Sequence, residues 1–219
     1  MMTVRGMHHE CRLPFRAVPH SAPPVPSLIL LVRHGATEWS VTGQHTGRTD
    51  IPLTSDGERQ ARDAARVIDH WLDGADPVVY TSPLQRAART AELALPRHTA
   101  EPVPALMEYD YGNYEGLTTS EIYAQNPDFD LFGSGCPGGE NILQVAARCD
   151  SFAAKLERTA AGRAVVAFTH GHLSRILTAR MLGIPASAAG GLWNDTASVA
   201  AINLHRGRLV LVGWNITAL

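Results

Sequence analysis

Cysteine is scarce in this sequence, and its spacing argues against the usual structural uses of the residue. The 219 residues include only Cys11, Cys136 and Cys149, an odd number with no Cys-x-x-Cys pair. A disulfide framework or a zinc knuckle needs paired or clustered cysteines, so neither is indicated. We therefore expect reduced thiols and a cytoplasmic location.

Long apolar runs and an excess of basic charge are also lacking. No stretch approaches the roughly 20 apolar residues that a membrane-spanning helix requires. The formal net charge is −2, which gives no overall positive field for nucleic acid or an anionic membrane surface. We expect neither membrane nor nucleic-acid partners, and a homo-oligomer is compatible with the sequence.

The first 27 residues lack the continuous apolar core of a secretion signal. They combine histidines and arginines with the proline-rich run PHSAPPVPS. We expect residues 1–27 to be a disordered leader, or part of it to precede a start at Met7. Residues 28–219 are expected to form a single domain, because 45% apolar and 18% charged residues are an ordinary globular balance.

The remaining chain alternates strand patterns with helix patterns. Short apolar runs predict strands at residues 28–32, 77–83, 164–171, 197–204 and 208–214, the last two as a hairpin. Apolar stripes at helical spacing and capping residues predict helices at residues 54–72, 84–95, 138–161 and 173–182. This alternation predicts an α/β fold, a three-layer sandwich in which helices cover both faces of a mostly parallel sheet.

Polar groups follow three of the predicted strands, as RHG, TSPLQR and THGH. Ligands bind beyond the carboxyl ends of the central strands in such sheets, so these groups are expected to meet at one edge. Gly35 and Gly171 directly follow histidines, where the absence of a Cβ would let the backbone approach a ligand.

The residues at these strand ends suit phosphoryl transfer. Arg33 and Arg86 carry planar donor forks that match phosphate oxygens. Of His34 and His170, a neutral imidazole can attack phosphorus to give a phosphohistidine, while the other neutralises charge together with the arginines. An acid is still needed to protonate the departing alcohol, and the segment MEYDYGNYEG offers Glu108, Asp110 and Glu115.

The ordered motifs resemble the histidine phosphatase superfamily, the phosphoglycerate mutase-like proteins of branch 1. The matching segments run in the family's order from about residue 28 to residue 180: LVRHGATEW, GQHTGRTDIPLTSDGERQA, TSPLQRAARTAE, EYDYGNYEGLT, CPGGEN and FTHGHLSR. Each segment alone is weak evidence for the family, but the whole set in this order is specific to it. The resemblance implies a phosphoglycerate mutase-like fold and a phosphomonoester hydrolase that needs neither metal nor cofactor and acts on a small phosphorylated metabolite.

The resemblance also assigns roles to individual residues. It implies that His34 is the nucleophile, that Arg33, Arg86 and His170 bind the phosphoryl group, and that Glu108 is the proton donor and later the base. The family places its glutamate four residues before a glycine, which favours Glu108 over Asp110. Residues implied to contact substrate are Thr46, Gly47, Tyr111, Gly171, His172 and Arg175.

Some of these residues have ordinary alternatives. His172 may be read equally as a residue that flanks the helix after THG or as a substrate contact. Arg175 fits a surface charge, or a site residue that binds a second phosphate or a carboxylate. Within the family, EWSVTGQHTGRTDIPLT and EYDYGNYEGLTTSEI look similar to sedoheptulose-bisphosphatase-type enzymes and to broad acid phosphatases of actinobacteria. In the former type, Arg175 would bind the distal phosphate.

The segment between Arg97 and Arg148 contains no lysine or arginine. Its acidic residues are Glu101, Glu108, Asp110, Glu115, Glu121, Asp128, Asp130 and Glu140. In the family this segment forms much of the lid over the pocket, and the mutases have a longer, basic lid. A short acidic lid would repel a strongly anionic leaving group. We therefore expect a phosphatase for sugar or polyol phosphates, whose hydroxyls can bond to acidic and tyrosyl side chains.

Three alternatives remain. The first is a cofactor-dependent phosphoglycerate mutase, which would require a bisphosphoglycerate primer. The second is a non-catalytic binding module of the same fold, although every catalytic position is filled here. The third is a metal-dependent hydrolase, for which HGH at 170–172 is a weak signal because no third ligand motif accompanies it.

Overall fold

The computed structural model describes residues 26–160 and 162–218. Residues 1–25 of the predicted leader, with Cys11, lie outside this part of the chain. The elements in chain order are β1 (Leu28–Arg33), α1 (Glu38–Thr42), α2 (Ser55–Leu72), β2 (Val78–Thr81), α3 (Gln85–Ala94), β3 (Glu101–Pro102), η1 (Pro104–Leu106), η2 (Gly112–Tyr114), α4 (Thr119–Gln125), α5 (Ile142–Thr159), β4 (Val165–Thr169), α6 (Gly171–Met181), η3 (Ala186–Gly191), β5 (Val199–His205) and β6 (Arg208–Ile216).

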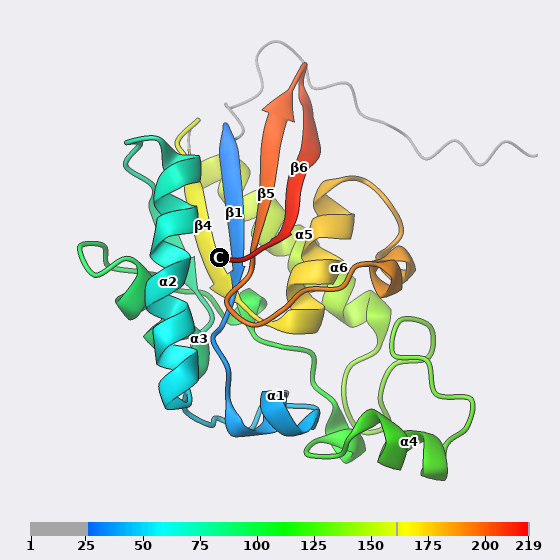
Figure 1. Ribbon diagram of the computed structural model, residues 1–219. Coiled ribbons are helices and arrows are strands. Elements are labelled where there is room, and N and C mark those ends of the chain that lie inside the picture. Colours follow the sequence, from blue (N-terminus) through cyan, green and yellow to red (C-terminus); the bar gives the residue numbers. More distant parts are fainter. Residues whose placement is uncertain (1–25, 161, 219) are drawn as a thin grey trace, which may run out of the picture.

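A six-stranded sheet in the order β3-β2-β4-β1-β5-β6 forms the centre of the molecule (Figure 1). Strands β3, β2, β4 and β1 are parallel, and β5 and β6 continue the sheet antiparallel. The β5–β6 turn places Arg206 and Gly207 at positive φ, 49° and 76°, as a tight right-twisted hairpin requires. The predicted mostly parallel sheet and its terminal hairpin are confirmed.

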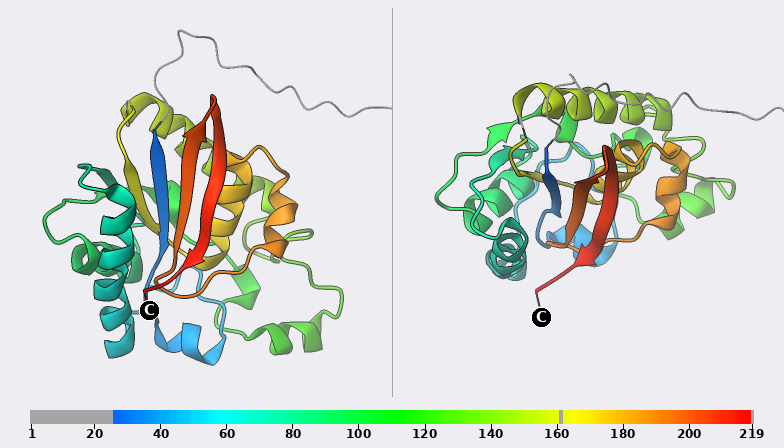
Figure 2. Two further views of the ribbon diagram at one scale, coloured as in Figure 1. Left: turned by 45° about the horizontal axis from the view of Figure 1, so that its top comes forward. Right: turned by 90° about the horizontal axis from the view of Figure 1, so that it is seen from above.

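Helices cover both faces of the sheet, which gives three layers (Figure 2). Alternate residues of β1 pack against opposite layers. Ile29 and Leu31 pack with α5 and α6, whereas Leu30 and Val32 pack with α2 and α3. Because β1 is buried on both faces, its sequence is continuously apolar rather than alternating. The three-layer α/β prediction is confirmed.

The carboxyl ends of β1, β2 and β4 reach the same edge of the sheet, as predicted, and α1 and α4 lie beyond that edge (Figure 1). Helix α6 begins at Gly171, two residues before its predicted start. Neither α1 nor α4 was predicted, because five and seven residues are too few to show a helical period. Within the described part of the chain, no helix is long and apolar enough to cross a membrane.

Candidate active site

His34 follows β1 and is held by main-chain contacts. Its Nδ1 lies 2.7 Å from the carbonyl oxygen of Gly35. A carbonyl only accepts hydrogen bonds, so Nδ1 carries the proton and Nε2 has the lone pair. Burial, followed by the nearby charges of Arg86 and Arg33, holds the pKa of His34 well below its usual range. His34 is therefore a neutral imidazole with an available Nε2.

His170 follows β4 and contacts His34 edge-on, with the ring centroids 5.2 Å apart. The ring is fully buried, and its Nε2 lies 2.8 Å from Ser82 Oγ. Its Nδ1 has no hydrogen-bond partner in the protein. Burial and the charge of Arg86 keep the pKa of His170 well below its usual range. A buried polar atom without a partner next to the nucleophile is suited to contact a ligand.

The two arginines are anchored by backbone carbonyls. Arg33 donates from Nη1 to the carbonyl of Asn194 at 2.6 Å. Arg86, fully buried, donates to three carbonyls of the turn at residues 46–49, at 2.8 to 3.0 Å. The Nε atom of each arginine is buried without a partner. Arg33 directly precedes His34 and lies beside Gly171, the residue after His170, and the charges of Arg33 and Arg86 both act to lower the pKa of the two histidines.

Glu108 lies between the sheet edge and the amino terminus of α6. Its carboxylate accepts from the backbone N–H groups of Tyr109, His172 and Leu173, at 2.9 to 3.0 Å. His170, the N-cap residue of α6, gives no side-chain cap, so Glu108 supplies the missing acceptor from another segment. This explains the early start of α6. Asp110 instead accepts from the N–H of Gly112 and lies near Arg48.

A pocket of about 220 Å³ opens at this edge. Its lining includes His34, Arg33 and Glu108, together with five of the six residues implied to contact substrate: Thr46, Tyr111, Gly171, His172 and Arg175. Gly47 is not among the lining residues, and its N–H instead donates to Glu115 at 2.9 Å. Arg86 and His170 are fully buried behind the pocket wall.

His172 belongs to an aromatic group on one side of the pocket. Its Nδ1 lies 2.5 Å from the hydroxyl of Tyr111, and its ring stacks on His45 with a centroid separation of 5.8 Å. Burial and Arg175 keep the pKa of His172 well below its usual range. Of the two interpretations of His172, this position favours a substrate contact.

Arg175 extends from α6 to the pocket instead of lying on the surface. It donates to the carbonyls of Ala189 and Gly190 at 3.0 and 2.8 Å. Its guanidinium carbon lies 4.6 Å from the ring centroid of Phe132, a cation–π contact. Arg175 thus brings a third guanidinium group to the pocket lining.

The glycines after the two histidines also meet packing constraints within the protein. A Cβ on Gly35 would lie 2.2 Å from the carbonyl oxygen of Gly57, so the constraint is contact with the start of α2. A Cβ on Gly171 would lie 3.3 Å from Arg33 Nε. Gly171 also lines the pocket, and Gly35 does not. Gly35 fixes the nucleophile loop against a helix, and Gly171 leaves room for Arg33.

The expectation of an acidic pocket lining is wrong. Of the eight acidic residues between Arg97 and Arg148, only Glu108 lines the pocket. Asp110 and Glu140 lie within 4 Å of basic groups of Arg48 and Arg148, and Glu101 pairs with Lys155. Glu115, Glu121 and Asp130 accept hydrogen bonds from backbone N–H groups. Counting charges along the sequence missed these pairings, because their partners lie at or beyond the ends of the interval.

Sequence reasoning also missed several residues of the site. Ser82 lies in the quoted motif TSPLQR, and His45 in GQHTG, so their motifs were the available signal. Asn194 and Trp193 follow η3 and line the pocket, in a stretch without any recognised pattern. Trp193 is 68% exposed, an unusual exposure for tryptophan.

Comparison with known proteins agrees with this geometry. The sequence pattern of the histidine phosphatase superfamily (branch 1) matches residues 29–217. An acid phosphatase of Mycobacterium tuberculosis is 39% identical over 180 residues, which cover 82% of this chain and 87% of that protein. The sedoheptulose 1,7-bisphosphatase of Saccharomyces cerevisiae is 31% identical over 182 residues, covering 71% of this chain and 67% of the relative.

Solved structures support the same assignment. The structure of the product of a Mycobacterium tuberculosis open reading frame superimposes with a TM-score of 0.83 at 37% identity and covers 88% of this chain and 98% of that one. Phosphoglycerate mutases are among the further relatives. The resemblance stated from the motifs is confirmed. The chain belongs to branch 1 of the histidine phosphatase superfamily, and it is a phosphatase of that family.

Proposed function

We propose that the protein hydrolyses sugar or polyol phosphates through a phosphohistidine on His34. One observation carries the proposal: the His34 ring is neutral and donates from Nδ1 to its own main chain. Its Nε2 is therefore available to attack phosphorus in a pocket that Arg33 lines, with Arg86 and His170 buried behind the wall.

In the first step, Nε2 of His34 attacks the phosphorus atom and the bond from phosphorus to the ester oxygen breaks. The guanidinium groups of Arg33 and Arg86 neutralise charge on the three equatorial oxygens, and the unpartnered Nδ1 of the neutral His170 donates a hydrogen bond to one of them. Glu108, in its protonated form, gives its proton to the departing alkoxide. Its Oε2 accepts only one of the three backbone hydrogen bonds, so it has acceptor capacity left for this proton.

In the second step, water attacks the phosphohistidine. The Glu108 carboxylate now accepts a proton from that water, the phosphorus–nitrogen bond breaks, and inorganic phosphate leaves. His34 regains its neutral state. Positive charge comes from guanidinium groups throughout, so the proposal requires no metal ion.

Further residues of the pocket lining support a polyhydroxylated leaving group. Gln44, Thr119 and Tyr111 offer neutral hydrogen-bonding groups, and the exposed face of Trp193 lies at the rim. Indole faces stack against the C–H faces of sugar rings, while neutral polar groups bond to hydroxyls. These residues replace the acidic lid as the support for sugar or polyol phosphates.

The position of Arg175 is a reason to test two further substrate classes. Its guanidinium lines the same pocket as His34 and can meet a second anionic group. A sugar bisphosphate would place its distal phosphate there, and a phosphoglycerate its carboxylate. The mutase alternative therefore keeps a specific observation in its favour.

A substrate panel tests the proposal. Phosphate release is measured for sugar and polyol monophosphates, sugar bisphosphates and 3-phosphoglycerate, and mutase turnover is measured with a bisphosphoglycerate primer. The expected result is the highest kcat/KM on a neutral polyol or sugar phosphate. His34→Ala is expected to abolish turnover and acid-labile phosphoenzyme together. Primer-dependent interconversion that exceeds hydrolysis would establish the mutase, and phosphoenzyme retained in His34→Ala would remove the mechanism.

Two accompanying expectations remain predictions. Among the described residues, no group of three or more His, Cys, Asp or Glu side chains is placed to hold a metal ion. A chelator assay nevertheless has to decide metal independence. The cytoplasmic location rests on the cysteine pattern, and Cys136 and Cys149 are buried free thiols.

A further inference from the structure

Arg148, on α5, makes contacts that use every donor of its guanidinium group. Nη1 donates to the carbonyls of Ala105 and Met107 at 2.9 and 2.5 Å, and Nη2 donates to the carbonyl of Glu108 at 3.0 Å. Nε and Nη2 also donate to Glu140 at 2.8 and 3.0 Å. A guanidinium has five N–H donors, so none remains for substrate. Arg148 holds the backbone on which Glu108 is mounted.

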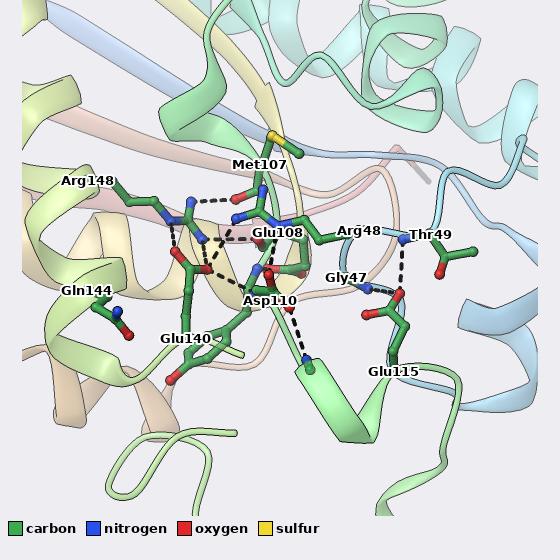
Figure 3. Close-up of polar contacts among 12 residues, drawn as sticks. Gly47, Arg48, Thr49, Met107, Glu108, Asp110, Glu115, Glu140, Gln144 and Arg148 are labelled. Atoms are coloured by element: carbon green, nitrogen blue, oxygen red, sulfur yellow. Dashed lines mark hydrogen bonds and ion pairs between the residues drawn. The ribbon is translucent and has the colours of Figure 1, made fainter. Parts of the chain in front are cut away.

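Glu140 secures the other end of the same segment. Its Oε2 accepts from the backbone N–H of Asp110 at 2.9 Å, and its own N–H donates to the carbonyl of Asp110 at 2.9 Å. Figure 3 shows Glu140 between Arg148 and Asp110. The backbone from residue 105 to residue 110 is thus fixed at five polar atoms by two residues that do not line the pocket, four of them by side chains and the carbonyl of Asp110 by the backbone of Glu140.

A third side chain links this segment to the turn that holds Arg86. Arg48 Nη2 lies 3.5 Å from Glu140 Oε2, and Arg48 Nε lies 3.6 Å from Asp110 Oδ2. Figure 3 shows Arg48 beside Asp110 and Glu140. The neighbours of Arg48 in the chain, Gly47 and Thr49, accept hydrogen bonds from Arg86 through their carbonyls. The network contains two arginines and two carboxylates, so its formal charge is zero.

We propose that the ion pair of Arg148 and Glu140 positions Glu108 for proton transfer, and that Arg48 keeps this segment in register with the turn that anchors Arg86. Arg148 and Glu140 are positioning residues, because neither side chain lines the pocket in which the substrate would bind. The inference rests on the proposed role of Glu108. A proton is transferred only over hydrogen-bond distance, so small displacements of the carboxylate reduce the rate of a step that depends on the acid.

The leaving group provides the test. An alkyl alcohol needs the acid's proton, whereas p-nitrophenolate leaves without it. Glutamine has the shape of glutamate but only one acceptor oxygen. In Glu140→Gln, either the Asp110 N–H or Arg148 therefore loses its acceptor. We expect kcat/KM to fall by about tenfold or more on an alkyl phosphate and by less than about threefold on p-nitrophenyl phosphate. A structural defect would lower both equally.

Asp150→Asn is the matched control. Asp150 also lies on α5 and accepts two hydrogen bonds from Arg180, at 2.8 and 2.9 Å, but it does not touch residues 105–110. Its kcat/KM ratio between the two substrates is expected to equal that of the unmodified protein. If kcat/KM of Asp150→Asn also fell selectively on the alkyl phosphate, the inference would be overturned.

A double-mutant cycle with Glu108→Gln separates this inference from the proposed function. We expect Glu108→Gln alone to show the selective alkyl loss, and Glu140→Gln to add less than about twofold to it. No selective loss in Glu108→Gln would refute the proposed acid itself. Selective loss in Glu108→Gln but not in Glu140→Gln would refute only the positioning role.

Arg148→Lys provides a second variant in case Glu140→Gln is unfolded. Lysine keeps the charge but has three donors for five acceptors, so the same selective loss is expected. Thermal unfolding monitors the fold of each variant. If neither variant folds, the network is a requirement of the fold and the positioning role is rejected.

Discussion

Lowering the pH from 7 to 5.5 should destabilise the protein through the histidines that the active site holds without charge, above all His34 and His170. His34 is 4% exposed and His170 is fully buried, and the pKa of each lies well below its usual range of about 6.5. Below that pH the unfolded chain takes up a proton at each histidine, whereas the folded chain does not. Unfolding therefore becomes more favourable as the pH falls.

The size of the effect follows from proton linkage. For one histidine that titrates near pH 6.5 when unfolded and stays neutral when folded, the free energy of unfolding falls by about 1.2 kcal/mol between pH 7 and pH 5.5. His34 and His170 together give about 2.5 kcal/mol, a large part of the stability of a typical domain. His172, whose pKa burial also lowers, adds to this loss. Carboxyl groups with a lowered pKa, such as Asp195, lose their contribution only at lower pH.

Urea unfolding at pH 7.0 and pH 5.5, with linear extrapolation to water, measures this difference. His170→Gln removes one of these groups, so the pH-dependent loss should shrink by about 1.2 kcal/mol. A free energy of unfolding that is equal at both pH values would refute the reasoning. So would an NMR titration in which the ring signals of His34 and His170 move with a midpoint near 6.5.

Three further predictions concern activity. Phosphate release should persist in excess chelator because guanidinium groups supply the positive charge; a loss that added metal reverses would contradict this. Trp193→Ala should raise KM for a hexose phosphate by about fivefold, equivalent to about 1 kcal/mol of stacking, and leave glycerol phosphate nearly unchanged; equal shifts in KM would show that the indole does not stack. Ser82→Ala removes the partner of His170 Nε2 and should lower kcat about tenfold, with recovery in Ser82→Thr; unchanged kcat would exclude that role.

The sequence predicted the part of the site that depends on strand order. His34 and His170 each end an apolar run, and parallel neighbouring strands must bring their carboxyl ends to one edge. Their proximity therefore follows from local pattern and topology alone. The choice of Glu108 over Asp110 came from the family's motif. In the structure Glu108 lines the pocket, while Asp110 lies near Arg48.

The parts that could not be predicted are contacts between segments far apart in the chain. Arg148 reaches carbonyls about 40 positions earlier, and Asn194 gives its carbonyl to Arg33 from 161 positions away. Backbone carbonyls occur at every residue, so no side-chain pattern marks the ones that an arginine will use. For the same reason, the acidic segment seemed to face the pocket although its carboxylates are mostly satisfied elsewhere.

The carbonyls that hold Arg86 have a consequence for the energetics of the reaction. Three of its N–H groups are bound to the turn at residues 46–49, and the ring of His34 is bound to its own main chain. Their dipoles and charges are thus preorganised during folding, before any substrate arrives. Water around a free phosphate ester must reorient as charge moves to the leaving oxygen, whereas this enclosure already has the orientation that the transition state needs.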